Sequence, residues 1–244
     1  MARLSVNLNK VALLRNSRRT GVPDLLAFPE RVKASGGLGI TIHPRPDERH
    51  IRRSDVPALA SAIDAWRPAF EYNIEGNPTS DFLDMIAPVR PEQCTLVPDA
   101  ATAFTSDKGW DLDAGDIAAL AQPIKRLKSL GTRVILFVDP DPAIAARAAD
   151  SGADGIEIYT GAYAAAYRKG TAERLLDAIA ALGSNATQCG LVVNVGHDLN
   201  LDNIGSLISV LPHLHEASIG HELTADSLVM GFDQAVRLYA QALR

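Results

Sequence analysis

Short apolar runs alternate with amphipathic stretches along almost the whole chain. The runs are rich in Val, Ile and Leu and are flanked by Gly, Pro or Asp, as strands covered on both faces of a parallel sheet are. They predict eight strands, at Leu4–Leu8, Gly39–His43, Ala69–Tyr72, Cys94–Val97, Val134–Val138, Gly155–Tyr159, Leu191–Val195 and Ala217–Ile219.

The stretches between the runs carry the signals of helix ends. DAGDIAALAQPIKRLKSLG and DPAIAARAADSG each begin with Asp and end near Gly, as capped helices do. Pro29, Pro57 and Pro123 lie inside such stretches, so we expect kinks or displaced boundaries there. Eight strands alternating with helices in 244 residues predict a (β/α)8 TIM barrel, with a doubly wound open sheet as the alternative. No linker-like segment interrupts the pattern, so residues 1–244 are expected to form a single domain.

Composition narrows the class of protein. The formal charge of −5 lacks the basic excess that broad nucleic-acid binding needs. No run approaches eighteen apolar residues, so we expect no membrane span. Asn7, Asn9 and Lys10 interrupt the first apolar stretch, which therefore does not resemble a signal peptide, and a cytoplasmic location is expected. Cys94 and Cys189 are far apart and are interpreted as buried reduced thiols.

Polar side chains follow the predicted strands. No G-x-G-x-x-G or G-x-x-x-x-G-K motif follows any strand, which argues against dinucleotide and P-loop sites. Barrel enzymes instead place their chemistry at the C-terminal ends of strands and in the loops that follow. The side chains at these positions are Asn7, Asn9, Lys10, Arg15 and Arg18 after the first strand, His43, Arg45, Arg49 and His50 after the second, Glu71, Thr105, Glu157, Asn194, His197, Gly220 and His221.

Each of these residues taken alone has an ordinary structural interpretation. Their convergence is what favours a site, because buried charges such as Glu71 and Glu157 are costly without partners. Two other histidines, in the segment LPHLHE, are interpreted as structural. Arginine and lysine side chains and the backbone around Gly220 can bind phosphoryl groups, while His43 and His197 can transfer protons. The residues therefore predict acid–base chemistry on a small phosphorylated substrate.

Several segments together resemble the pyridoxine 5′-phosphate synthase family. They are SVNLNKVALLRNSR, GITIHPRPDERHI, FEYN, LVPD with FTSDKGWD, GIEIYTGAYA, LVVNVGHDLN and HEASIGHEL, in that order, over about residues 4–240. The resemblance implies a TIM barrel with additional helices that assembles as a homo-oligomer, commonly an octamer. It also implies condensation of 1-deoxy-D-xylulose 5-phosphate with 3-amino-2-oxopropyl phosphate, with loss of phosphate and water and with no metal or organic cofactor.

The resemblance also implies roles for matched positions. His43 and Glu71 would accept protons, His197 would donate one, and Glu157 would stabilise a transition state. The amino-ketone phosphate would be held by Asn7, Arg18 and the turn formed by Gly220 and His221. The deoxyxylulose phosphate would be held by Arg45, His50 and Thr105.

The sequence departs from the family pattern in two places. Asn9 and Lys10 stand where Asp-His is frequent, so a negative charge is lost and a fixed positive charge is added beside the deoxyxylulose phosphate. Asp198 stands where Gly is frequent in contact with the amino-ketone, so its carboxylate is expected to point away from phosphate. These departures affect local substrate contacts and leave the predicted reaction unchanged.

Three other interpretations compete with the synthase. A phosphosugar isomerase or epimerase would use Glu71 and His197 as an acid–base pair. A catalytically idle phosphate-binding scaffold would not need two carboxylates near anionic ligands. A metal hydrolase would be built from His43, His197 and His221, whereas the synthase interpretation assigns no metal ligands.

Overall fold

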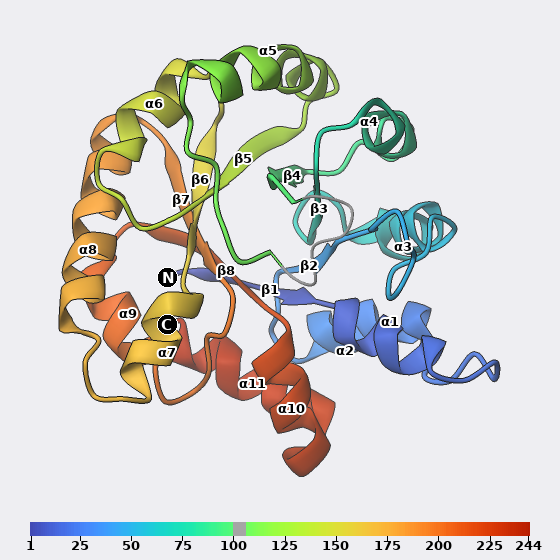
Figure 1. The fold of residues 1–244 in the computed structure, drawn as a ribbon. Helices are drawn as coiled ribbons and strands as arrows, with labels where there is room; N and C mark the ends of the chain where they lie inside the picture. The colour runs from blue at the N-terminus through green and yellow to red at the C-terminus, as the bar shows by residue number, and fades with distance from the viewer. Residues whose placement is uncertain (100–105) are drawn as a thin grey trace.

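The computed structural model of the chain describes residues 1–99 and 106–244. Eight parallel strands close into a barrel in sequence order, with β8 returning to pair with β1 (Figure 1). The predicted TIM barrel is confirmed, and closure excludes the open-sheet alternative. The strands are β1 Arg3–Asn7, β2 Gly39–Ile42, β3 Glu71–Gly76, β4 Gln93–Leu96, β5 Arg133–Val138, β6 Gly155–Tyr159, β7 Val192–Gly196 and β8 Leu214–Ile219.

The helices form the outer layer of the barrel (Figure 1). They are α1 Asn9–Asn16, α2 Phe28–Ala34, α3 Asp55–Ile63, α4 Ser80–Ile86, α5 Ala114–Ser129, α6 Ile144–Asp150, α7 Gly161–Tyr167, α8 Glu173–Gln188, α9 Ile204–Val210, α10 His221–Met230 and α11 Phe232–Ala242, with 3-10 turns at Leu25–Ala27 and Asp64–Trp66. Two helices lie between β6 and β7 and two follow β8, so the expected additional helices are present. Among the described residues, no helix has both the length and the apolar character needed to cross a membrane.

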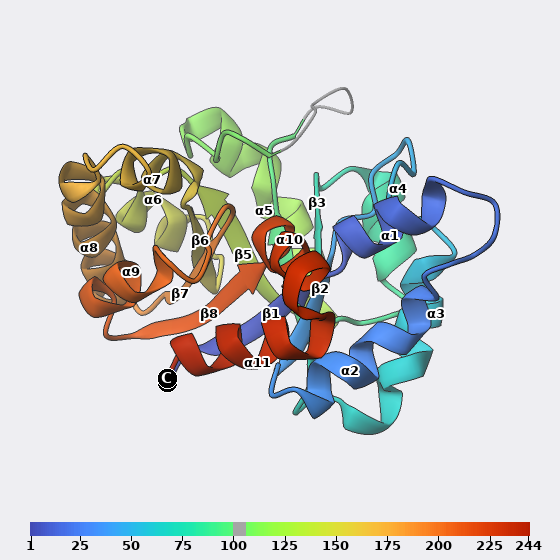
Figure 2. The ribbon, with the colours of Figure 1, turned by 90° about the horizontal axis from the view of Figure 1, so that it is seen from below.

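The last two helices join the two ends of the chain. Helices α10 and α11 pack on each other and lie beside β1 and β8 (Figure 2). The amide of Ala2 donates to the carbonyl of Leu243 at 3.2 Å. The C-terminal helix therefore covers the first strand, and the termini lie side by side.

The three prolines are accommodated without disrupting the ring of helices. Pro29 and Pro57 lie in the first turns of α2 and α3, where no intrahelical N–H bond is lost. Pro123 lies inside α5. Of the two free thiols, Cys94 is buried as expected, whereas Cys189 is exposed at the end of α8, so the expectation of burial was wrong there.

The interior of the barrel is unusually polar. Most TIM barrels fill this space with branched apolar side chains. Here Ser5 and Thr41 share a hydrogen bond of 2.7 Å, Asn73 donates to Thr41 at 3.3 Å, and Thr95 donates to Asn73 at 3.2 Å. Because these buried groups are mutually hydrogen-bonded, they hold the strands at a fixed separation without an unsatisfied polar cost.

Strand β3 runs further along the chain than the apolar pattern predicted. It begins at Glu71, which pairs in register with Gly39 at the start of β2, and it ends at Gly76. The expected strand stopped at Tyr72 because Asn73 and Glu75 break the apolar run. Both side chains are buried inside the polar barrel, so a rule built on apolar interiors ended the strand too early.

Candidate active site

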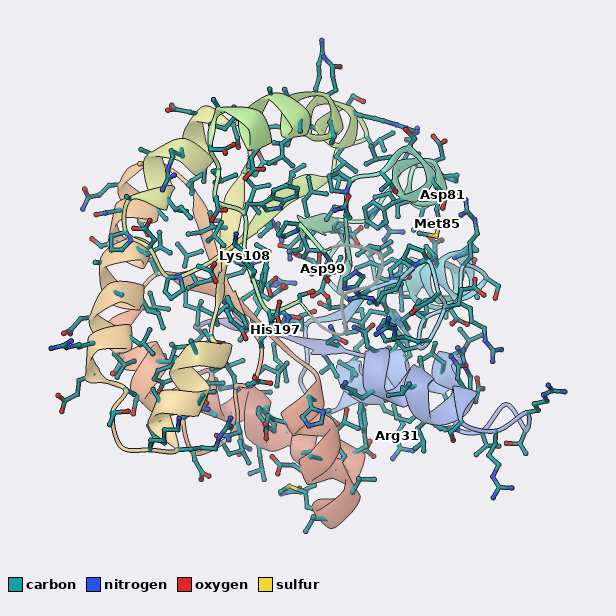
Figure 3. The ribbon with its side chains drawn as sticks, viewed as in Figure 1. Arg31, Asp81, Met85, Asp99, Lys108 and His197 are labelled. Carbon is teal, nitrogen blue, oxygen red and sulfur yellow. The ribbon has the colours of Figure 1, made fainter. Side chains whose placement is uncertain are left out.

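The C-terminal ends of the strands surround a cavity of about 260 Å³. Most of the predicted site residues line it, namely Asn7, Asn9, Lys10, His43, Arg45, His50, Glu157, His197, Asp198, Gly220 and His221. In Figure 3, His197 and Asp99 are labelled near the middle of the barrel opening. Side chains from far-apart segments therefore meet at one rim, as the sequence predicted.

Arg49, which follows the second strand, also lines the cavity, together with three residues that the sequence did not assign to it: Glu75, Ser106 and Ser218. Glu75 is the most consequential of them. It lies near the end of β3 and is 5% exposed. The sequence did contain a signal for it, because FEYNIEG holds a second carboxylate four positions after Glu71, on the same face of an extended strand.

Glu71 lies at the opposite end of the barrel, so its expected place at the rim is wrong. It is the first residue of β3 and forms ion pairs with Arg133 on β5 and, at 3.5 Å, with Arg3 on β1. The error follows from the early end predicted for β3, which made Glu71 seem close to the strand's C-terminus. The carboxylate of β3 that does lie at the rim is Glu75, four residues further along the same strand.

His43 and Glu75 form the first imidazole–carboxyl pair. Nδ1 of His43 lies 3.7 Å from Oε2 of Glu75, and both side chains are buried. Burial and the nearby Arg45 guanidinium hold the pKa of His43 well below its usual value. Burial and the Glu157 carboxylate raise the pKa of Glu75 well above its usual value. Both groups therefore favour their neutral forms.

His197 and Glu157 form the second pair. Nδ1 of His197 lies 3.8 Å from Oε1 of Glu157, and the His197 ring packs against Phe137 at 4.8 Å between centroids. Burial and the Glu216 carboxylate raise the pKa of Glu157 to about 8, against a hydrogen bond from Thr95 that lowers it. Burial lowers the pKa of His197, whereas Asp198 and Asp99 raise it. Glu157 is therefore an acid that still holds its proton at neutral pH.

Asn7 and Asn9 orient the first pair. The backbone amide of His43 donates to Oδ1 of Asn9 at 2.9 Å, and the amide of Asn9 donates to Oδ1 of Asn7 at 2.9 Å. Nδ2 of Asn7 then donates to Oε2 of Glu75 at 3.4 Å. The chain thus uses Asn9 as a neutral acceptor that anchors the start of the loop carrying His43.

One wall of the cavity gathers positive charge. Lys10, Arg45 and Arg49 come from the segments after β1 and β2, and His50 lies beside them. Burial, Arg45 and Lys10 lower the pKa of His50 to about 4, so His50 is neutral at physiological pH. Arg45 forms a buried ion pair of 3.0 Å with Asp99, whose carboxylate also accepts from Ser106 at 2.5 Å. This wall has the charge and donors that bind phosphate.

A second anion-binding element lies at the start of α10. Gly220 precedes this ten-residue helix, and Gly220 and His221 both line the cavity. A Cβ at Gly220 would come 2.9 Å from the Cβ of Asn7, so only glycine allows the two backbones to approach this closely. The free N–H groups of a helix N-terminus favour phosphate.

The turn after β7 has unusual backbone geometry. His197 has φ 80° and Asp198 has φ 57°, both in the left-handed region that side chains disfavour. A Cβ at the preceding Gly196 would come 2.2 Å from Oε1 of Glu157. The turn is therefore built to bring the His197 imidazole over Glu157, at a cost in backbone strain.

The two predicted residues not yet placed are Arg18 and Thr105. Arg18 is exposed on the segment after α1 and does not line the cavity, so its expected place at this rim is wrong; this segment projects away from the barrel in Figure 1. Thr105 lies outside the described residues. Among the described residues, no group of three His, Cys, Asp or Glu side chains has the geometry to hold a metal ion, which leaves the three-histidine hydrolase without a ligand set.

Solved structures with a similar backbone support the fold alone. Tryptophan synthase from M. tuberculosis matches with a TM-score of 0.62 at 14% identity, over 100% of this chain and 94% of that one. Phosphoribosyl anthranilate isomerase from Thermus thermophilus matches with a TM-score of 0.58 at 11% identity, over 99% and 98%. At such identities a shared barrel says nothing about a shared reaction.

Sequence comparison is decisive about the family. The chain is 48% identical to pyridoxine 5′-phosphate synthase of Brucella anthropi, over 99% of each chain. It is 46% identical to pyridoxine 5′-phosphate synthase of Porphyromonas gingivalis, over 100% of this chain and 99% of that one. The family model described as pyridoxal phosphate biosynthesis protein PdxJ matches residues 4–244. The chain therefore belongs to the PdxJ family of enzymes, the pyridoxine 5′-phosphate synthases.

Proposed function

We propose that the cavity condenses 1-deoxy-D-xylulose 5-phosphate with 3-amino-2-oxopropyl phosphate, releasing pyridoxine 5′-phosphate, phosphate and water. The observation that carries the proposal is the pair of imidazole–carboxyl units, His43 with Glu75 and His197 with Glu157, that line one cavity beside a cationic wall. Ring closure from a ketone and an amino-ketone needs repeated proton transfers, which two such units can supply.

Each phosphate has a separate binding region. Arg45, His50 and Lys10 bind the phosphate of the deoxyxylulose substrate through charge and N–H donors. The start of α10, at Gly220 and His221, binds the phosphate of the amino-ketone, close to Asn7. Holding both substrates in neighbouring regions of one cavity removes much of the entropic cost of their encounter.

The first pair accepts protons from the substrates. The lowered pKa of His43, caused mainly by burial, leaves its imidazole unprotonated and able to take a proton as the amine adds to the ketone. Glu75, 3.7 Å away, provides the adjoining carboxyl group that exchanges a proton with Nδ1. His43 is therefore the acceptor of this pair, and Glu75 takes the place at the rim that the sequence had assigned to Glu71.

The second pair returns protons to leaving groups. The pKa of Glu157, raised to about 8 mainly by burial, keeps a proton on that carboxyl group at neutral pH. His197 donates from its ring to the departing oxygen, and Glu157 replaces the proton at Nδ1 across 3.8 Å. Neutral Glu157 also avoids a fixed negative charge beside two phosphorylated substrates.

A two-substrate assay tests the proposal. Both substrates mixed with metal-free protein should give pyridoxine 5′-phosphate, detected by its ultraviolet absorbance and by phosphate release. An isomerase or epimerase would transform one phosphosugar alone, without the amino-ketone. Folded protein that yields no pyridoxine 5′-phosphate would end the proposal.

The remaining features of the enzyme are proposed together. Residues 1–244 act as one barrel domain, without an organic cofactor or metal. The enzyme works in the cytoplasm as a homo-oligomer, with the octamer as the expected assembly. Exposed apolar side chains such as Leu14, Val22 and Val229, which are 53%, 68% and 88% exposed, support burial against other copies. Sedimentation velocity measures this directly, and a monomer at micromolar concentration would refute the assembly.

A further inference from the structure

The turn at residues 48–50 is held by a cluster of side chains that do not line the cavity. Helix α1 ends with Arg15 and Asn16, and both reach across to this turn. His50 and Arg49 on the turn do line the cavity, whereas Arg15 and Asn16 do not. The proposed reaction makes no direct use of Arg15 or Asn16.

Arg15 and Asp55 form the base of the cluster. The Arg15 guanidinium donates to both carboxylate oxygens of Asp55, at 2.7 and 2.8 Å, and both residues are buried. A third bond runs from Nη2 of Arg15 to the carbonyl of His50 at 3.1 Å. Asp55 also accepts from the amide of Arg52 at 2.7 Å. Because the planar Arg15 guanidinium is hydrogen-bonded to both Asp55 oxygens and to the His50 carbonyl, its orientation is fixed.

Asn16 extends this base to the turn itself. Nε of Arg15 donates to Oδ1 of Asn16 at 3.1 Å, which fixes the orientation of the amide. Nδ2 of Asn16 then faces three successive carbonyls, those of Glu48, Arg49 and His50, at 3.3, 3.2 and 2.7 Å. Glu48 has φ 51°, so the turn adopts a strained conformation that such contacts stabilise.

The consequence appears in the His50 ring. The amide of Ile51 donates to Nδ1 of His50 at 2.9 Å, which requires Nδ1 to be the unprotonated acceptor. The proton of the neutral ring therefore sits on Nε2. Because this bond joins adjacent residues, its geometry depends on the backbone at residues 50 and 51. Arg15 and Asn16 both donate to the carbonyl of His50 and so hold this backbone in place.

We propose that Arg15 and Asn16 are positioning residues that fix the 48–50 turn and so present His50 to the cavity as a neutral Nε2–H donor for the phosphate of the deoxyxylulose substrate. This inference deepens the proposed function and rests on it for the identity of the substrate. Neither residue touches substrate, and both act through His50. The neutral His50 ring thus supplies an N–H donor without adding another positive charge next to Arg45 and Lys10.

Asn16→Ala is the informative change, because removing Arg15 would leave the buried Asp55 carboxylate unpaired and endanger folding. We expect the KM for deoxyxylulose phosphate to rise roughly ten-fold, while kcat and the KM for the amino-ketone change less than about two-fold. Asn185→Ala is the matched control, since Asn185 also donates to a carbonyl, that of Pro142 at 3.1 Å, but on the exposed side of α8. It should change none of these constants.

A double-mutant cycle separates positioning from general loosening. In a His50→Ala background, Asn16→Ala should raise the KM for deoxyxylulose phosphate no further, because the side chain through which it acts is gone. Independent effects that multiply in the double mutant would overturn the proposal, as would an unchanged KM in Asn16→Ala alone.

The ring tautomer provides a readout that needs no substrate. Nitrogen-15 spectra of labelled histidine should show His50 protonated at Nε2 in the wild-type protein and a mixture of tautomers in Asn16→Ala. A single unchanged tautomer in the variant would also overturn the proposal. Wild-type protein that makes no pyridoxine 5′-phosphate would defeat the proposed function, yet these spectra would still show whether the positioning of His50 is correct.

Discussion

Nδ1 of His43 on the loop after β2 lies 3.7 Å from Oε2 of Glu75 on β3, and Nδ2 of Asn7 on β1 donates to the same carboxyl oxygen at 3.4 Å. Three neighbouring strands thus fix one proton-transfer unit. Across the cavity, His197 and Glu157 repeat the arrangement on β6 and the turn after β7. In each unit the imidazole and the carboxyl group can exchange a proton, so that neither is left as an isolated buried charge.

The two carboxylates of β3 should separate catalysis from stability. Glu75→Gln should lower kcat by roughly a hundred- to a thousand-fold with little change in KM, because the amide cannot exchange a proton with His43. Glu71→Gln should leave kcat within a few-fold but destabilise folding by about 3 kcal/mol, since it unpairs Arg133 at the other end of the barrel. Steady-state kinetics and urea unfolding of both variants measure this. The reverse pattern would return the catalytic role to Glu71.

The β3 result shows which part of the site could be predicted from the sequence. All eight strands were found, because β2 and β5 are apolar at nearly every position and covered on both faces. Glu75 was missed because the interior of this barrel is lined by Asn73 and Thr95 rather than by branched apolar residues. A pattern that equates burial with apolar character cannot register such a strand.

The placement of Arg18 and the contacts of Arg15 lay beyond the sequence for a different reason. Both arginines follow the same strand and have the same chemistry. Arg15 lies in the last turn of α1 and is buried against Asp55, whereas Arg18, three residues later, lies beyond the helix and is exposed. Side-chain direction at a helix end depends on tertiary packing, which residue type and spacing do not specify.

His197→Asn should lower kcat by roughly a thousand-fold while the fold is retained. The amide cannot donate a proton from the Nε2 position or take one from Glu157. The matched control is His213→Asn, because His213 is exposed before β8, away from the cavity. Circular dichroism checks the fold and the two-substrate assay checks the rate. A near-normal rate in His197→Asn would remove the donor role.

Asp198 should weaken binding of the amino-ketone phosphate. Asp198 lines the cavity proposed to receive two phosphorylated substrates, so its negative charge lies close to them, and its φ of 57° favours glycine. Asp198→Gly should therefore lower the KM for the amino-ketone by roughly three- to ten-fold without reducing thermal stability. Asp202→Asn, which removes a charge from an exposed position on the same segment, is the control. A raised KM in Asp198→Gly would instead indicate that the carboxylate binds the substrate's amino group.

Glu157 should make the stability of the protein depend on pH in a direction opposite to that of an ion-paired carboxylate. Burial and the Glu216 carboxylate raise the pKa of Glu157 from 4.5 to about 8, so the folded state binds this proton more tightly than the unfolded state does. The stability that this tighter proton binding contributes is therefore fully present below the pKa of the unfolded state and is lost as the pH rises through about 8. Glu157→Gln cannot ionise and should escape this loss.

Melting temperatures of the wild type and of Glu157→Gln, measured by calorimetry from about pH 6 to about pH 9, test this expectation. The difference between the two proteins should grow in favour of the variant as the pH rises. Asp177→Asn, at an exposed position on α8, should show a constant difference over the same range. A difference that stays constant for Glu157→Gln as well would mean that Glu157 is already ionised at neutral pH. It would then act as a fixed negative charge beside His197, and the proton returned to the leaving group would have to come from elsewhere.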